Sequence, residues 1–144
     1  MPTNCRFSVG MHILAVLASH PGEPVTSAYI AGSVNTNPVV IRRLLSALRR
    51  ARLVEATKGS AGGFALARRS EDITLLEVYR TVEPVEPLAF PESEPNAKCP
   101  IGAKIQSALA GVFLTAQAAM EKELARVTLA DIVQRISPGR ARSA

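Results

Sequence analysis

The chain has 144 residues, of which 47% are hydrophobic and only 4% aromatic, and a formal net charge of +5. This length fits one domain, or one domain with an appended arm, around an aliphatic core. Two cysteines are too few for a secreted disulfide framework or a complete zinc site. The chain shows neither the pattern of a signal peptide nor an apolar run long enough for a bilayer, so we expect a cytoplasmic protein without a membrane partner.

The positive charge is concentrated in the first part of the sequence. Residues 1–82 contain ten basic and five acidic side chains, whereas residues 83–144 contain seven of each. Eight Lys or Arg residues fall between Arg42 and Arg69, against one acid, Glu55. This concentration favours a polyanionic partner, and a solvated basic face without a partner is the alternative.

Two helices are predicted before residue 35. Residues 7–19 are almost continuously apolar, and a helix apolar on most sides is buried or shared between a core and an interface. A short helix over residues 26–34 follows, with Thr26 as its N-cap. Three of its side chains are expected to face the core: Tyr29, Ile30 and Val34.

The next helix, predicted from Pro38 to Ala51, is strongly amphipathic. Asn37 suits the N-cap, and Pro38 suits the first position, where no amide hydrogen is needed. The spacing i, i+3, i+4, i+7 places four apolar residues on one face: Ile41, Leu44, Leu45 and Leu48. With the preceding helix and the turn at Asn35 and Thr36, this helix matches helix-turn-helix geometry.

A β-hairpin is predicted next. Residues 53–58 and 64–67 read as short strands, and the glycine-rich residues 59–63 allow a sharp exposed turn. A basic helix followed by a hairpin is typical of a winged helix-turn-helix, in which the hairpin is the wing. The predicted fold class is therefore mainly α with a small β-hairpin wing.

A capping-box pattern at Thr74 and Glu77 opens a further helix that ends near Val82. We take residues 1–82 as the winged helix-turn-helix DNA-binding domain. The proline-rich and acidic residues 83–100 are expected to form a loop.

One long helix is predicted from Ile101 to about Arg126, spanning roughly 40 Å. So small a domain cannot cover it, so we expect it to pair with the same helix of a second subunit in a homodimer. A capping box at Thr128–Asp131 opens a last helix. Residues 101–136 thus form the dimerisation helix and C-terminal helix, before a disordered tail over residues 137–144. The apolar stripe of the long helix consists of Ile101, Ile105, Leu109, Val112, Ala116, Met120 and Leu124.

Side chains suited to DNA lie on the open face of the amphipathic helix, at its entrance and in the wing. Arginine pairs with phosphate or the guanine edge, and a cation at the wing suits the negative potential of a narrow minor groove. The predicted DNA-binding residues are Asn35, Thr36, Asn37, Val39, Arg42, Arg43, Ser46, Arg50, Lys58, Gly59, Gly62 and Gly63. The alternatives are that some arginines, above all Arg49, only form surface ion pairs, and that the glycines serve the turn alone.

Cys99 is the candidate redox sensor. It precedes the long helix, and a helix N-terminus lowers the pKa of a thiol, as does the neighbouring Lys98. An unreactive cysteine at a dimer contact is the alternative. His12 is expected to be a buried histidine satisfied by a hydrogen bond. No catalytic constellation is recognisable, so we do not expect an enzyme.

Several segments, in order, resemble the Rrf2 family of bacterial winged-helix transcriptional regulators. They are ILAVLAS, RRLLSALRRARLVEATKGSAGGFALAR and DITLLEVYRTVE, which contain the family's Lys58-Gly59, Gly62-Gly63-Phe64 and Ile73-Thr74-Leu75. The likeness covers residues 5–136 and is nearest to the YwnA-like subgroup. It implies a homodimeric repressor that binds double-stranded DNA at a palindromic operator, under a redox or small-molecule effector.

The chain departs from the family pattern at two places. Arg52 stands where glycine is common after the third helix, so we expect a less left-handed helix exit than usual. Cluster-binding members have three closely spaced cysteines before the long helix, where this chain has only Cys99. We therefore expect no cofactor. The alternatives are a [2Fe-2S] sensor using His12 and Cys99 across the dimer, and a protein-interaction module that has lost DNA binding.

Overall fold

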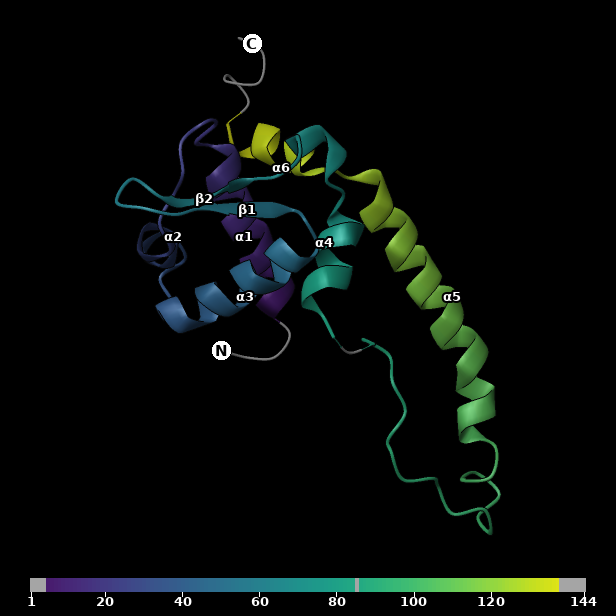
Figure 1. Cartoon of the computed structure of the whole chain (residues 1–144). Helices are drawn as coiled ribbons and strands as arrows, with labels where there is room; N and C mark the ends of the chain where they lie inside the picture. The colour runs from purple at the N-terminus through teal and green to yellow at the C-terminus, as the bar shows by residue number, and fades with distance from the viewer. Residues whose placement is uncertain (1–4, 85, 138–144) are drawn as a thin grey trace.

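The computed structural model of the chain describes residues 5–84 and 86–137. Within them, six α-helices and one antiparallel hairpin form a winged-helix body and a projecting arm (Figure 1). This architecture confirms the predicted fold class. Residues 138–144 of the predicted disordered tail lie outside the described residues. The elements are α1 (Arg6–Ala18), α2 (Ser27–Val34), α3 (Pro38–Arg50), β1 (Val54–Thr57), β2 (Gly63–Leu66), the 3-10 helix η2 (Ser70–Asp72), α4 (Leu75–Val82), α5 (Ile105–Arg126) and α6 (Leu129–Ile136).

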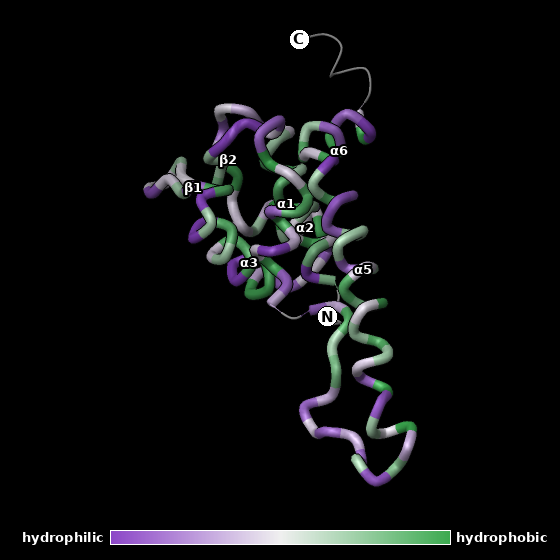
Figure 2. Tube along the Cα trace, turned by 90° about the vertical axis from the view of Figure 1, so that its right-hand side faces the viewer, coloured by the Kyte–Doolittle hydropathy of each residue, from purple (hydrophilic) through white to green (hydrophobic). Residues whose placement is uncertain are grey.

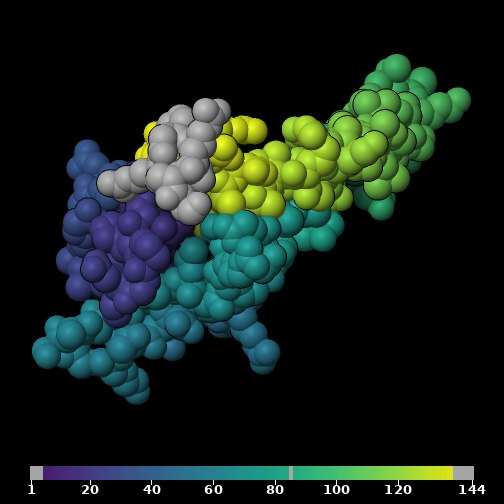
Figure 3. All heavy atoms as spheres, turned by 90° about the horizontal axis from the view of Figure 1, so that it is seen from above, coloured from purple at the N-terminus to yellow at the C-terminus, as the bar shows by residue number. Residues whose placement is uncertain are grey.

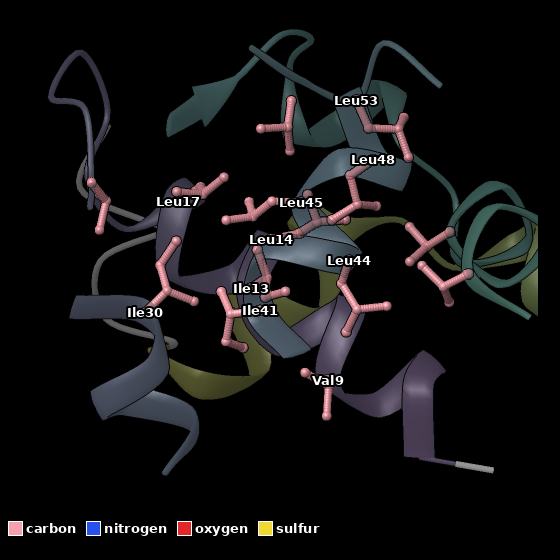
Figure 4. Packing of buried hydrophobic residues seen from close by; sticks show 14 of the residues in the cluster. Val9, Ile13, Leu14, Leu17, Ile30, Ile41, Leu44, Leu45, Leu48 and Leu53 are labelled. Carbon is pink, nitrogen blue, oxygen red and sulfur yellow. The ribbon is translucent and has the colours of Figure 1, made fainter. Parts of the chain in front are cut away.

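The core is an aliphatic cluster around α1, which packs against α2, α3, α4, α6 and β2 (Figure 4). Ile13 of α1 and Ile41 of α3 are fully buried, and all four residues predicted on the apolar face of α3 belong to the cluster. Gly10 lies against α4, where a Cβ would be 3.4 Å from Val82 Cγ1. The predicted core position of the apolar first helix is confirmed, and five of its 13 residues are buried: Val9, Gly10, Ile13, Leu14 and Leu17.

The predicted helix caps all form, and one of the two predicted capping boxes is incomplete. The Thr26 hydroxyl caps α2, and the Asn37 amide oxygen caps α3. Both reciprocal bonds of the capping box at Thr128–Asp131 are present. At the start of α4, the Thr74 hydroxyl accepts a hydrogen bond from the Glu77 amide, but the Glu77 carboxylate pairs with an arginine that follows β2.

Three other predictions about local structure are wrong. Tyr29 is 56% exposed, because the fully buried Ile30 occupies the core side of this short helix. Arg52 has a φ of 61°, so the exit of α3 is left-handed despite the side chain. The long helix begins at Ile105 rather than Ile101, because residues 101–104 form turns ahead of it.

α6, which the sequence grouped with α5, packs on the winged-helix body. Leu129 is fully buried in the core, and α6 contacts α1 and η2. Leu75 N donates to Val127 O at 2.9 Å, and Leu129 N donates to Ile73 O at 2.8 Å. These bonds attach the C-terminal end of α5 to the start of α4, so the remainder of α5 projects from a fixed point.

The arm consists of α5 and residues 86–104, which run out beside the helix and then turn back into it (Figures 1 and 2). The ring of Phe90 stacks on Phe113 of α5, with centroids 5.2 Å apart. None of the 22 residues of α5 is buried. In the described part of the chain, each helix is too short or too polar to span a membrane.

Candidate nucleic-acid interface

α3 turns one face to the core and the other to solvent. Opposite its buried side chains lie Arg42, Arg43, Ser46 and Arg50, all of which are exposed. Arg50 Nη1 donates to Ser46 Oγ at 3.1 Å, so these side chains, one helical turn apart, form one polar unit. The four side chains that the sequence predicted on the open face of α3 are thus all exposed.

The arginines of α3 differ from the arginines elsewhere in the chain that form ion pairs. Neither Arg42, Arg43 nor Arg49 forms a side-chain hydrogen bond or ion pair with the described residues. A guanidinium group carries five donors and no acceptor, so these groups are available to phosphate or to a guanine edge. The ion pairs among the described residues lie elsewhere, at Arg68–Glu77, Arg69–Glu71, Arg80–Glu121 and Arg126–Glu123.

The turn between α2 and α3 gathers the predicted entrance residues. Asn35 ends α2 with a φ of 62°, a left-handed conformation that asparagine tolerates. Asn37 Oδ1 accepts from Val39 N at 2.8 Å, and the Val39 side chain is 43% exposed. Thr36 is partly covered, and its amide donates to Ala31 O at 3.1 Å. Of the four predicted residues at the entrance of α3, Thr36 is thus the least accessible to solvent.

The hairpin forms the predicted wing. β1 and β2 pair in antiparallel register, and the hairpin projects from the body on the side away from α5 (Figure 3). Gly59 has a φ of 106°, and a Cβ on Gly62 would lie 2.1 Å from Thr57 O. The turn therefore requires both glycines, whatever they contact. Lys58 precedes the turn and is exposed.

Gly63 serves a different purpose from the turn glycines. Val25 and Phe64 exchange two backbone hydrogen bonds of 2.8 Å, which tie the wing to the segment before α2. A Cβ on Gly63 would lie 2.7 Å from Val25 O. Gly63 therefore permits this close backbone approach, a structural role that the sequence did not reveal.

Cys99 is exposed and lies on the segment that turns into α5 at the distal end of the arm (Figure 1). Hydrogen bonds from the backbone N–H groups of Gly102 and Ile101 lower the pKa of its thiol. The predicted direction of the pKa shift is confirmed, and these two N–H groups cause it rather than Lys98. The donors belong to the turn ahead of α5, and not to the first turn of that helix.

His12 is exposed rather than buried, and its Nε2 lies 2.9 Å from Ser33 Oγ. The predicted hydrogen bond is present, but α1 lies in the body, whereas the segment with Cys99 lies at the far end of the arm (Figure 1). Among the described residues, no three His, Cys, Asp or Glu side chains are grouped to hold a metal ion. The donors of one chain thus do not fit an iron–sulfur cluster, which takes four protein ligands.

Comparison with known proteins extends over nearly the whole chain. The family model Rrf2, described as an iron-dependent transcriptional regulator, matches residues 3–135. YwnA of Bacillus subtilis (strain 168), assigned to the HTH-type transcriptional regulators, is 44% identical over 133 residues, covering 92% of this chain and 98% of YwnA.

Two solved structures with related sequences share the fold. T. potens IscR superposes with a TM-score of 0.71 at 25% identity, covering 92% of this chain and 86% of IscR. CymR, described as the global cysteine regulator of B. subtilis, gives 0.62 at 28% identity, covering 90% of this chain and 94% of CymR. The resemblance first seen in the α3 and wing sequences is confirmed. The chain therefore belongs to the Rrf2 family, and it is a DNA-binding transcriptional regulator built on a winged helix-turn-helix.

Proposed function

We propose that the protein represses transcription as a homodimer bound to a palindromic operator, with α3 in the major groove and the wing at the adjacent minor groove. The observation that carries this proposal is the exposed face of α3, whose three arginines, Arg42, Arg43 and Arg50, pair with no acid among the described residues. Unpaired cations beside a projecting hairpin form a surface complementary to the phosphate backbone.

α5 supports the proposed second subunit. Val112 is 62% exposed, and of the predicted stripe only Val112 and Ala116 lie in the open groove, whereas Leu109, Met120 and Leu124 are half-buried within the single chain. Small side chains allow two helices to approach closely, so the occupant we propose is α5 of a second copy. The groove is lined by Ser107, Ala108, Gly111, Val112, Thr115, Ala116 and Ala119.

The symmetry of such a dimer sets the form of the operator. A two-fold dimer offers two copies of α3, so we expect a palindrome with half-site centres about one helical turn apart. The attachment of α5 to the start of α4 would transmit the dimer geometry to each α3. Repression predicts that deletion of the gene raises transcription from the promoter carrying this operator.

The test is fluorescence anisotropy with DNA from upstream of the protein's own gene and with unrelated DNA of equal length. Arg43→Ala should weaken operator binding by about 1–3 kcal/mol if this arginine contacts a base. Lys58→Ala should weaken binding to both DNAs alike and reduce the salt dependence. Arg135→Ala removes the same charge from an exposed position on α6 and is the control. Wild-type affinity in the first two variants would refute the assigned surface.

We also propose that oxidation of Cys99 weakens operator binding. The thiol is exposed, its pKa is lowered by the Gly102 N–H, and it precedes the proposed dimer helix. Hydrogen peroxide would convert the thiolate to a sulfenic acid: sulfur loses two electrons, the O–O bond breaks and hydroxide leaves. Oxidation at Cys99, on the segment that leads into α5, would alter the packing of α5. The separation of the two α3 helices in the dimer would change as a result.

Peroxide treatment followed by dithiothreitol tests this switch, with operator binding measured at each stage. Wild type and Cys5→Ser should lose affinity and recover it, whereas Cys99→Ser should not respond. A response in all three proteins, or in none, would remove Cys99 from the mechanism and leave the DNA-binding proposal intact.

Regulation without an iron–sulfur cluster is part of the proposal, because Cys99 is the one cysteine in the segment that leads into α5, where cluster-binding members of the family have three. The absorption spectrum of anaerobically purified protein tests this point. Visible bands that His12→Ala or Cys99→Ser abolishes would contradict it and favour a cluster bound across the dimer.

A further inference from the structure

Arg52 occupies a backbone conformation that its residue type disfavours. Among the described residues, Arg52 and Asn35 are the non-glycine positions with positive φ, at 61° and 62°. Asparagine visits the left-handed region readily, whereas in arginine the Cβ crowds the following carbonyl oxygen. A strained residue therefore stands at the exit of α3.

The conformation is imposed by the chain reversal between α3 and β1. Leu53 N donates to Leu48 O at 3.0 Å and Arg52 N donates to Arg49 O at 2.9 Å, as in a left-handed helix cap. Leu53 is 1% exposed, so the chain must return to the core directly after this cap. Glycine would adopt this left-handed conformation without strain. We therefore look to the side chain for the reason that arginine occupies the position.

Within the described chain, no side-chain hydrogen bond or ion pair of Arg52 offsets this strain. Its side chain is exposed and forms no hydrogen bond or ion pair with the described residues. The favourable place for a cation at the C-terminus of α3 is already occupied by Arg49 and Arg50. The positive charges of Arg49, Arg50 and Arg52 repel one another in the free protein. A neighbouring polyanion would attract all three and so offset this repulsion.

We propose that Arg52 binds a DNA phosphate at the rim of the groove that α3 enters. The inference rests on the proposed function and adds a residue that the sequence pattern did not assign to DNA. A recognition helix contacts bases mainly through its N-terminal residues, so a cation at its exit meets the sugar–phosphate backbone. Such contacts position the helix and read no sequence.

Two substitutions separate the side chain of Arg52 from its backbone. Arg52→Gly relieves the strain, so the thermal midpoint should stay equal or rise, while affinity falls by the same factor on operator and unrelated DNA. The loss of one phosphate contact should reduce the slope of log affinity against log salt concentration by about 0.9. Arg52→Lys keeps the charge and should keep the wild-type slope, as should the control Arg135→Ala.

An unchanged slope in Arg52→Gly would overturn the assignment, and so would an equal loss in Arg52→Lys, because the effect would then not depend on charge. If the wild type itself failed to bind DNA, the proposed function and this inference would fall together. Normal wild-type binding with an unchanged slope in Arg52→Gly would overturn the inference alone.

Discussion

α3 and α5 are both helices with an apolar side, but they bury it to different extents. α3 places Ile41, Leu44, Leu45 and Leu48 in the core of its own chain and keeps its arginines outside. α5 is longer, at 22 residues, and none of them is buried. Val112 and Leu114 of α5 are 62% and 72% exposed.

This difference separates two kinds of exposed surface. The apolar side of α3 is satisfied within the chain, so its charged face is left for a polar partner. Leu109, Met120 and Leu124 of α5 are half-buried, whereas the side that carries Val112 stays open, and burial of apolar area there would favour an apolar partner. On our proposal α3 binds DNA and α5 binds a second subunit, and substitutions in the two helices should have separable effects.

The largest effect is expected inside the body. Leu48→Ala should lower the free energy of unfolding by about 2–5 kcal/mol, because it removes a fully buried side chain and leaves a cavity. Urea denaturation followed by circular dichroism measures this loss. Leu114→Ala, at an exposed position of α5 outside the groove proposed for the second subunit, is the control and should change stability by less than about 0.5 kcal/mol. Similar losses in both variants would contradict the contrast between the helices.

Self-association should respond to a charge on the open side of α5. Val112→Lys should weaken dimerisation by on the order of 3 kcal/mol, because two-fold symmetry brings two cations together in an apolar contact. Val112→Ala, which only shortens the side chain, should have a smaller effect. Analytical ultracentrifugation gives both dissociation constants. A Val112→Lys dimer as tight as the wild type would exclude this side of α5 as the interface.

Gly111 of α5 and Gly32 of α2 form a matched pair. A Cβ on either meets no atom within 4 Å, so alanine should raise helix stability by about 0.8–1 kcal/mol at each site. Only Gly111→Ala should also weaken self-association, because Gly111 lines the groove in which we place the second helix. Thermal melts and sedimentation of both variants test this. Equal dimer affinities would argue against close helix contact at Gly111.

The smallest effect concerns the cap of α6. The backbone N–H of Thr128 holds the pKa of Asp131 below its ordinary value, and the Thr128 hydroxyl and Arg135 act in the same direction. A carboxylate whose pKa is lowered on folding contributes stability above its unfolded pKa, and that contribution is lost as the pH falls through the folded pKa. Below about pH 4 the wild type should therefore lose thermal stability more steeply than Asp131→Asn. Parallel pH curves would contradict this role.

Features that depend on near neighbours were predictable from the sequence. The caps at Thr26, Asn37 and Thr128 each form a hydrogen bond that spans only two or three residues. The period of α3 identified its buried face, since one helical repeat determines which side chains share a side. The need for glycine at Gly59 and Gly62 was predictable as well, because a sharp turn requires backbone conformations and close approaches that a Cβ prevents.

The predictions that failed depended on contacts between distant segments. Tyr29 and Ile30 are adjacent and both apolar, and only the packing of α2 on α1 and α3 decides which one is buried. Local preference argued against a left-handed Arg52, but the burial of Leu53 in the core overrides that preference. His12 lies in an apolar stretch, yet it is exposed beside Ser33 of another helix.

By itself, the sequence determined the winged-helix class, the basic face of α3 and the position of the wing, because periodicity, capping and turn chemistry act over a few residues. Only the tertiary structure decided that α6 packs on the body, that Gly63 lies against Val25, and which side of α5 stays open. These features depend on which distant surfaces meet, and a one-dimensional pattern does not contain that information.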